Sequence, residues 1–223
     1  MKRAALGFRM HSGWGIMVAI AGDDAGVELL QRRRILITDP DIPGATQPYH
    51  FAASIGPGNE HRPKLGLSAA EQHIATCAAL SERLAFAAIS DAIRELGARD
   101  YRIAGAAVLM ASGRALPSLD RILAAHPLIH TAEGEFFRTA VRKACERLNI
   151  PLTTIPEREL EEYAKTMFGS AASRVRSRIA SLGGSIGPPW TKDHKAAALG
   201  AAILQASIIQ TSTEENRGGQ NAE

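Results

Sequence analysis

The first 38 residues hold three short apolar runs separated by glycine-containing turns, and this pattern constrains the fold most. The runs cover residues 4–10, 15–21 and 27–38, with Ser12-Gly13 and the acidic segment 22–26 between them. Segments of strand length joined by such short turns are typical of antiparallel pairing between neighbours in the chain. We therefore expect a three-stranded antiparallel meander at the N-terminus.

The rest of the chain alternates helical patterns with two further strand candidates. The continuous apolar run 103–110 has the length and composition of a central strand covered on both faces, and residues 150–155 form the second candidate. Helical periodicity predicts a short helix at residues 117–125 and longer helices at 68–96, 131–148, 170–182 and 192–208. The expected N-caps are Ser68, Thr131 and Thr191, and the expected stops are Gly97 and Gly183-Gly184.

A chain of 223 residues with 45% hydrophobic and 22% charged residues has the size and composition of one globular domain. We expect a single domain over residues 1–210, an irregular flap at 39–67, where five prolines fall, and a disordered polar tail at 211–223. The uncharged stretch 196–210 is shorter than the ~20 residues of a membrane span. The two cysteines lie in apolar helical patterns, as buried free thiols do, so we expect a cytoplasmic protein without a membrane partner.

The first hairpin reads Leu6-Gly7-Phe8-Arg9-Met10-His11-Ser12-Gly13-Trp14-Gly15. With the order of the elements, it resembles the Holliday-junction resolvase branch of the ribonuclease H-like superfamily, in which a glycine-hydrophobic-aspartate segment precedes a small-residue turn and a Gly-x-Gly strand start. Residues 131–156 and 171–203 resemble the later helix, strand and final helices of that branch. The resemblance implies an α/β, ribonuclease H-like fold, with a five-stranded mixed sheet in which parallel strands extend the meander and helices flank the sheet.

The metal-binding positions of that superfamily are where this sequence departs from it. The related nucleases hold two divalent cations with carboxylates from the first strand, the central strand and the final helix. Here the first-strand position is Arg9, the end of the central strand (108–112) has no carboxylate, and only Asp193 matches. Arginine cannot bind magnesium and brings a fixed positive charge. The resemblance therefore predicts the fold without two-metal cleavage. It also implies that Asp193 points toward Arg9 and pairs with it in place of a metal, although the plainer interpretation of residues 192–195 is a solvated first helical turn.

Arg9 and His11 lie two residues apart and therefore share a face of a regular strand. With Ser12 in the adjoining turn, they form a candidate site for an anion such as phosphate. The plainer interpretation is that they are ordinary hairpin residues with local partners.

The segment 130–138 is the most unusual in the chain. With Thr131 as the N-cap, Glu133 and Glu135 would lie in the first helical turn, where the helix dipole favours carboxylates. Alternatively, His130 and Glu133 project from the helix start toward the edge of the sheet, where they bind a metal or act as acid and base. Glu135 is spaced to pair with Arg138 at i, i+3, and Arg138 is a further candidate for phosphate binding.

The sequence also has two basic clusters and lacks several common functional motifs. Alternation splits the strand triplet 32–34 between two faces, whereas Arg174 and Arg178 share a helix face from which they could contact a phosphate backbone. Solvation or ion pairing is the plainer role for both clusters. The sequence has no Walker loop, no Gly-x-Gly-x-x-Gly after a strand, no His-Glu-x-x-His and no Cys-x-x-Cys, which disfavours common nucleotide and zinc classes.

The leading hypothesis is a degenerate nuclease-like protein that binds nucleic acid or a phosphate-bearing small molecule without two-metal nuclease activity. The alternative is an active metal-dependent hydrolase of phosphate esters with a rearranged site of His130, Glu133 and Asp193. Magnesium enters only in this alternative. A third hypothesis is an oligomeric interaction scaffold, which is favoured if helices 68–96 and 191–208 present apolar surface outward. A homo-oligomer is therefore one of the partners that the sequence allows.

Overall fold

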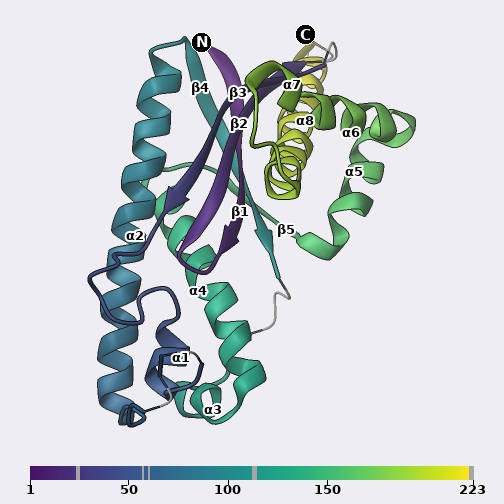
Figure 1. The fold of residues 1–223 in the computed structure, drawn as a ribbon. Coiled ribbons are helices and arrows are strands. Elements are labelled where there is room, and N and C mark those ends of the chain that lie inside the picture. Colours follow the sequence, from purple (N-terminus) through teal and green to yellow (C-terminus); the bar gives the residue numbers. More distant parts are fainter. Residues whose placement is uncertain (24–25, 57, 60, 112–114, 221–223) are drawn as a thin grey trace.

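The computed structural model describes residues 1–23, 26–56, 58–59, 61–111 and 115–220. Its centre is a five-stranded mixed sheet in the order β3-β2-β1-β4-β5 (Figure 1). The strands are β1 Lys2–His11, β2 Trp14–Asp23, β3 Gly26–Leu36, β4 Tyr101–Met110 and β5 Leu152–Pro156. β2 is antiparallel to β1 and β3, whereas β4 is parallel to both β1 and β5. The predicted meander, the central strand predicted at 103–110 and the parallel strands predicted to extend the meander are therefore confirmed.

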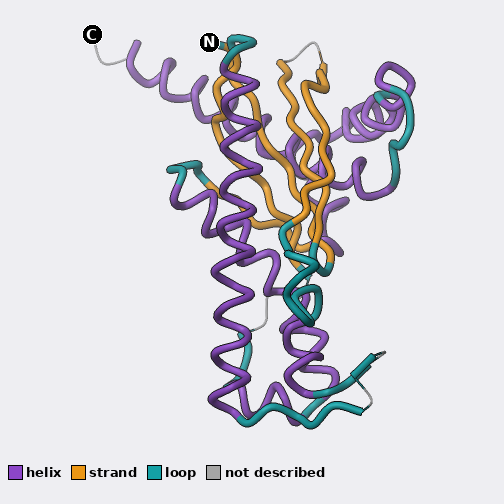
Figure 2. Tube along the Cα trace, turned by 60° about the vertical axis from the view of Figure 1, so that its left-hand side comes forward, coloured by secondary structure: helices purple, strands orange, loops and turns teal. Residues whose placement is uncertain are grey.

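Helices cover both faces of the sheet and project beyond one end of it. One face carries α2 Leu67–Gly97 and α4 His126–Arg147, and the other carries α5 Leu160–Phe168, α6 Ala172–Ser181 and α8 Lys192–Gln220 (Figure 1). The short helical turns are η1 Glu157–Glu159, η2 Gly169–Ala171 and α7 Gly183–Ile186. We call the projecting part the helical lobe; it consists of α1 Pro48–Ala53, α3 Leu119–Ala124 and the adjoining ends of α2 and α4 (Figure 2).

The alternation of side chains along β1 explains why both faces of the sheet are buried. Leu6 and Phe8 belong to the core under α2 and α4, whereas Ala5 belongs to the core under α8. Gly7 lies on the same face as Ala5, and there α8 comes so close that a Cβ at Gly7 would overlap the carbonyl oxygen of Ala197. The same face of β1 continues to Arg9, which contacts the first turn of α8.

Two helices begin at residues other than those predicted. α4 begins at His126, because Pro127 in the first turn has the fixed φ of a helix start. Thr131 is therefore not the N-cap; it lies inside the helix and donates its hydroxyl to the Pro127 carbonyl oxygen at 3.0 Å. α2 begins at Leu67 after an extended Gly66 and has no side-chain cap, so the cap predicted at Ser68 is also wrong.

Three connecting or terminal segments contain more helix than predicted. α8 continues through much of the segment 211–223, for which a disordered tail was predicted, and ends at Gln220; residues 221–223 lie outside the described part of the chain. The flap predicted at 39–67 contains α1. α6 ends at Ser181, next to the stop predicted at Gly183-Gly184, and these glycines begin the separate helical turn α7.

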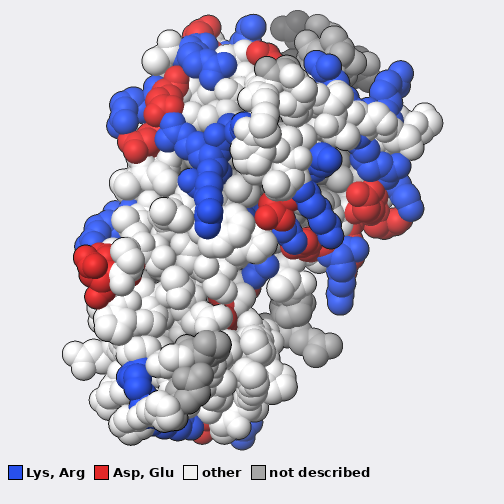
Figure 3. Space-filling view, in the orientation of Figure 1, with Lys and Arg blue, Asp and Glu red and all other residues white. Residues whose placement is uncertain are grey.

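Charged side chains of both signs are interspersed around the sheet, while the helical lobe is mostly uncharged on the face seen in Figure 3. Arg33 pairs with Glu95 of α2, whereas Arg32 donates to the carbonyl oxygens of Pro188, at 3.0 Å, and Pro189, so the basic triplet is split as predicted. Arg176 of the basic helix α6 pairs with Glu161 at 2.7 Å. Among the described residues, no helix combines the length and apolarity that a membrane crossing requires.

We expect Gly7→Ala to lower the free energy of unfolding by about 1–3 kcal/mol or more, because the new Cβ would push the α8 backbone away from β1. Urea denaturation followed by circular dichroism measures this loss. Gly97→Ala is the matched control, since a Cβ there meets nothing within 4 Å and alanine favours a helix. Equal stability of the Gly7→Ala variant and the native protein would show that the close approach is not required.

Candidate functional site

Arg9, at the carboxyl end of β1, joins three elements of the fold. Its Nε and Nη2 donate to Glu157 Oε1 at 3.0 and 2.6 Å, and its Nη1 donates to Asp193 Oδ1. Glu157 follows β5 directly, and Asp193 lies in the first turn of α8. The predicted pairing of Asp193 with Arg9 is therefore confirmed. Glu157 is a second carboxylate that the sequence analysis missed.

Glu157 is kept ionised by the arginine that it binds. Burial alone would raise the pKa of this carboxyl group, but the hydrogen bonds and charge of Arg9 outweigh burial, with smaller contributions from Arg138 and Lys192, and hold the pKa below its usual range. The sequence did contain a signal for this residue, because an acid directly after a parallel strand reaches the sheet end where ligands of such folds bind.

His11 completes a group of four residues, Arg9, His11, Glu157 and Asp193, which we call the Arg9 cluster. The His11 Nε2 lies 3.1 Å from Asp193 Oδ2 and 3.3 Å from Arg9 Nη1. Burial, and then the charge of Arg9, lower the pKa of His11, although Glu157 opposes this effect. The imidazole is therefore neutral near pH 7, and a proton on Nε2 would be donated to Asp193. Arg9 and His11 share a face of β1, as predicted.

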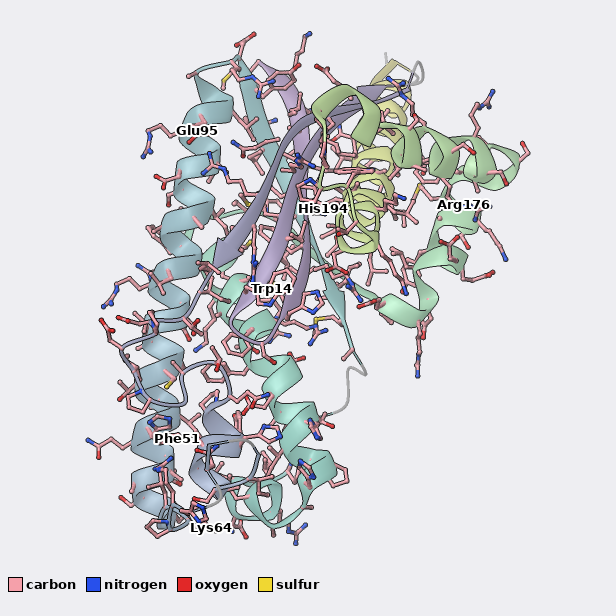
Figure 4. All side chains as sticks on the ribbon, viewed as in Figure 1. Trp14, Phe51, Lys64, Glu95, Arg176 and His194 are labelled. Atoms are coloured by element: carbon pink, nitrogen blue, oxygen red, sulfur yellow. The ribbon has the colours of Figure 1, made fainter. Side chains whose placement is uncertain are left out.

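An aromatic stack leads from the Arg9 cluster to the protein surface. The His11 ring stacks on the Trp14 indole, with 4.3 Å between ring centroids and an interplanar angle of 17°. The exposed Arg34 guanidinium lies 4.3 Å from the Trp14 ring centroid. Trp14 begins β2 near the end of the sheet that faces the helical lobe (Figure 4), and the exposed Ser12 lies in the turn before it. Ser12 and Arg34 are thus the solvent-facing neighbours of the cluster.

Arg138 approaches the same end of the sheet from α4. Its side chain is buried, with Nε donating to the Leu109 carbonyl oxygen at 2.9 Å and Nη1 donating to the Gly134 carbonyl oxygen. Its charge acts on the pKa of both His11 and Glu157. The predicted pair with Glu135 is not formed, because Arg138 turns towards β4, and Glu135 Oε1 lies 3.4 Å from Arg142 instead.

His130 and Glu133 lie in a different place, within the helical lobe. Glu133 is buried, and its Oε1 accepts hydrogen bonds from the backbone N–H groups of Tyr49 and His50 at 2.8 and 3.0 Å. Burial raises the pKa of Glu133 to about 7, although these two N–H groups oppose the shift. Metal binding or acid-base chemistry by His130 and Glu133 would therefore take place in the helical lobe and not at the edge of the sheet.

Two further histidines surround His130, and the sequence analysis missed both. His50, His126 and His130 offer ring nitrogens that all lie within 4.8 Å of one another, as a metal-binding set would. Burial, followed by the charges of His130 and His126, lowers the pKa of His50. The group could not be recognised from the sequence because His50 is far from the other two histidines along the chain. The i, i+4 spacing of His126 and His130 on one helix was nevertheless a visible signal.

The residues predicted to act together are thus divided between two places. Arg9 and Asp193 meet at the carboxyl end of the sheet, whereas His130 and Glu133 meet His50 in the helical lobe. The hydrogen bonds of Asp193 and Glu133 share no residue, and the elements around them belong to separate apolar cores. The trio His130, Glu133 and Asp193 is therefore not assembled into one site.

The strand order, the strand directions and the polar site at the carboxyl ends of β1 and β5 define a ribonuclease H-like fold. Within that class the structure resembles that of T. thermophilus RuvC in complex with Holliday junction substrate, with a TM-score of 0.51 and 10% sequence identity over 93% of this chain and 96% of that chain. A second structure of Thermus thermophilus RuvC gives a TM-score of 0.50, with the same identity and coverage. No family model and no curated protein sequence matches the chain significantly.

Nucleases with this fold hold divalent cations with carboxylates, and the carboxylates of the Arg9 cluster already have a cationic partner. Both carboxylates that the described residues bring to the cluster, Glu157 and Asp193, are bound by the Arg9 guanidinium. A cation at the same place would meet a fixed positive charge, and Arg138 adds a second one nearby. The geometry instead suits a stable ion-pair network with donors exposed at its edge.

We expect Glu157→Gln to destabilise the protein at pH 7 by roughly 1 kcal/mol, because it weakens charge-assisted bonds to Arg9. The pKa of Glu157 is lower in the folded than in the unfolded protein, so this stability is present above the unfolded pKa and is lost as the pH falls through the folded pKa. Urea denaturation at pH 7, 5 and 3 should therefore show the two proteins converging towards acid.

The control is Glu159→Gln, at a partly exposed acid that pairs with the exposed Arg158. A stability loss at Glu157→Gln that stayed the same from pH 7 to pH 3 would contradict an ionic role for this residue.

Proposed function

We propose that the protein binds nucleic acid through phosphate and base contacts at the carboxyl end of its sheet, and that it does not cleave by a two-metal mechanism. The observation that carries this proposal is the Arg9 guanidinium, which stands on the first strand and binds both nearby carboxylates. The proposal covers Arg9, His11, Ser12 and Arg138, together with Trp14 and Arg34.

The balance of charge around the cluster supports an anionic ligand. Arg9 pairs with Glu157 and Asp193, and with Arg138 and Lys192 close to Glu157 the positive charges outnumber these two carboxylates by three to two. Phosphate groups are bound well by arginine because its planar guanidinium offers several donors in a fixed geometry. In this arrangement Arg9 acts as the inner cation, and the ligand contacts groups further out.

The outer groups suit an unstacked nucleotide. Trp14 has His11 on one side and the exposed Arg34 guanidinium over its ring, while Ser12 offers a hydroxyl in the adjoining turn. Aromatic and guanidinium surfaces of this kind stack with bases of any sequence, and arginine also pairs with the phosphate backbone. The fold neighbour described in complex with a Holliday junction substrate adds support for DNA as the ligand.

The scaffold hypothesis receives less support from the surface. Among the described residues, the exposed large apolar side chains are Met1, Leu36, Leu67, Tyr163 and Ile186. Only Leu67 belongs to α2, and none lies in residues 192–211, the part of α8 whose side chains the structure describes, so these faces give little support to self-association.

Binding is tested by fluorescence anisotropy with a labelled four-way DNA junction, a duplex and a single strand. Arg34→Ala should weaken binding by about 5- to 150-fold, since a charge-assisted contact contributes roughly 1–3 kcal/mol. Arg9→Ala should weaken binding as well, because Glu157 and Asp193 would then lack their arginine partner and repel phosphate. Affinity should also fall as salt rises from 50 to 200 mM, through counterion release.

Arg94→Ala is the matched control, because Arg94 is an exposed arginine on α2 that pairs with Asp91. It should change affinity less than twofold. The proposal is refuted if Arg94→Ala loses as much affinity as Arg34→Ala, or if the native protein binds none of the three probes at 50 mM salt.

A second test concerns cleavage. With millimolar magnesium or manganese, the protein should leave junction, duplex and RNA–DNA hybrid substrates intact, because Arg9 occupies the first-strand carboxylate position. Arg9→Asp removes the guanidinium and adds a carboxylate, so this variant should bind magnesium where the native protein does not. Protein-dependent cleavage that Asp193→Asn abolishes would instead establish an active nuclease.

A further inference from the structure

Three histidine side chains in the helical lobe form a compact group, which we call the histidine cluster: His50, His126 and His130. The ring centroids are 5.5 Å apart for His50 and His126, 4.7 Å for His50 and His130, and 4.5 Å for His126 and His130. His50 is buried in α1, while His126 and His130 are exposed in the first two turns of α4. The cluster is separate from the Arg9 cluster and is not used by the proposed function.

The packing of the lobe holds these side chains together. Ala52 and Ala53 of α1 share an apolar core with Ile129 and Ala132 of α4, so the two helices are in direct contact. His126 and His130 are four residues apart and therefore lie on the same face of α4. The third imidazole comes from a helix more than 70 positions earlier in the chain, which makes the cluster a product of the tertiary fold.

We propose that His50, His126 and His130 bind one divalent transition-metal ion, for which Zn²⁺ fits best. Three imidazoles are a known protein ligand set for zinc, with the fourth position left for water or another ligand. Tetrahedral Zn–N bonds of 2.0–2.1 Å place ligand nitrogens about 3.4 Å apart, compared with a separation of at most 4.8 Å here. The exposed rings of His126 and His130 can rotate to close the difference.

Glu133 supplies the support that a metal-binding histidine needs. Its Oε1 lies 3.2 Å from His50 Nδ1 and also accepts the N–H groups of Tyr49 and His50. With the proton on Nδ1 donated to Glu133, the His50 Nε2 lone pair is free for the ion. Carboxylates in this position fix the tautomer and orientation of metal-binding histidines and increase their basicity.

The ligand atoms also determine the class of metal. Imidazole nitrogens suit Zn²⁺, Cu²⁺, Ni²⁺ and Co²⁺, whereas Mg²⁺ requires oxygen ligands in an octahedron. Because His126 and His130 are exposed, solvent reaches the fourth coordination position. The site therefore differs in both place and chemistry from the magnesium sites of nucleases with this fold.

The full chain, stripped of metal with EDTA and dialysed, is titrated with Zn²⁺ in competition with a chromophoric chelator, and separately with Co²⁺. We expect one Zn²⁺ per chain and visible absorption typical of tetrahedral Co²⁺. At a free Zn²⁺ concentration about 100 times the Kd, the melting temperature should rise by about 5–10 °C. Mg²⁺ should produce no shift.

His126→Ala and His130→Ala should each lower Zn²⁺ affinity by more than about 100-fold. Glu133→Gln, which keeps the shape of the side chain, should lower it by roughly 10- to 100-fold. Because His126 and His130 are exposed, their variants should melt at the native temperature without metal, which separates ligand loss from misfolding.

The matched control is His61→Ala, at another exposed histidine in the chain segment that leads into α2 and outside the cluster. This variant should bind Zn²⁺ like the native protein. The proposal is overturned if the His126→Ala/His130→Ala double variant still binds one Zn²⁺ per chain, or if the native chain binds none. It is also overturned if His61→Ala loses as much Zn²⁺ affinity as His126→Ala or His130→Ala. None of these results bears on DNA binding at the Arg9 cluster, so the two proposals fail separately.

Discussion

The close contact between β1 and α8 determines how the residues at the carboxyl end of the sheet are arranged. Gly7 allows the α8 backbone at Ala197 to lie directly on the strand. Arg9 is two residues after Gly7 on the same face of β1, and Asp193 is one helical turn before Ala197. The close approach therefore sets the register in which the arginine meets the aspartate. Any side chain at Gly7 would separate the strand from the helix and lengthen this ion pair as well.

A single helix connects the two polar sites of the molecule. The C-terminal part of α4 sends Arg138 to the β4 backbone beside the Arg9 cluster, while its first turns present His126, His130 and Glu133 to the helical lobe. One site is built from arginine and carboxylates, and the other is built from imidazoles around a buried carboxylate. These donor sets favour different ligands, an anion in the first site and a divalent transition-metal ion in the second.

Much of the sheet could be predicted from the sequence, since short turns and apolar runs specify neighbouring antiparallel strands and a buried parallel one. The pairing of Arg9 with Asp193 was also predictable, because the fold brings the first strand under the last helix. Glu157 was missed although its position directly after a predicted strand was a visible signal, whereas His50 joins its site only through contacts between distant segments. The cap expected at Thr131 was wrong because Pro127, four residues earlier, lies in the first turn of a helix that has already begun. Local signals compete at helix ends, whereas a long alternating strand has few alternatives.

The hydrogen bonds from Tyr49 and His50 to Glu133 have a consequence for the flap. A helix of six residues is too short to be stable in water, because it leaves most of its backbone groups without partners. In this structure a carboxylate from α4 accepts the first N–H groups of α1, so the terminus is capped by a residue more than 80 positions away. The helicity of residues 48–53 is therefore a property of their docking on α4 and not of their own sequence, and a peptide with this sequence alone would be unfolded.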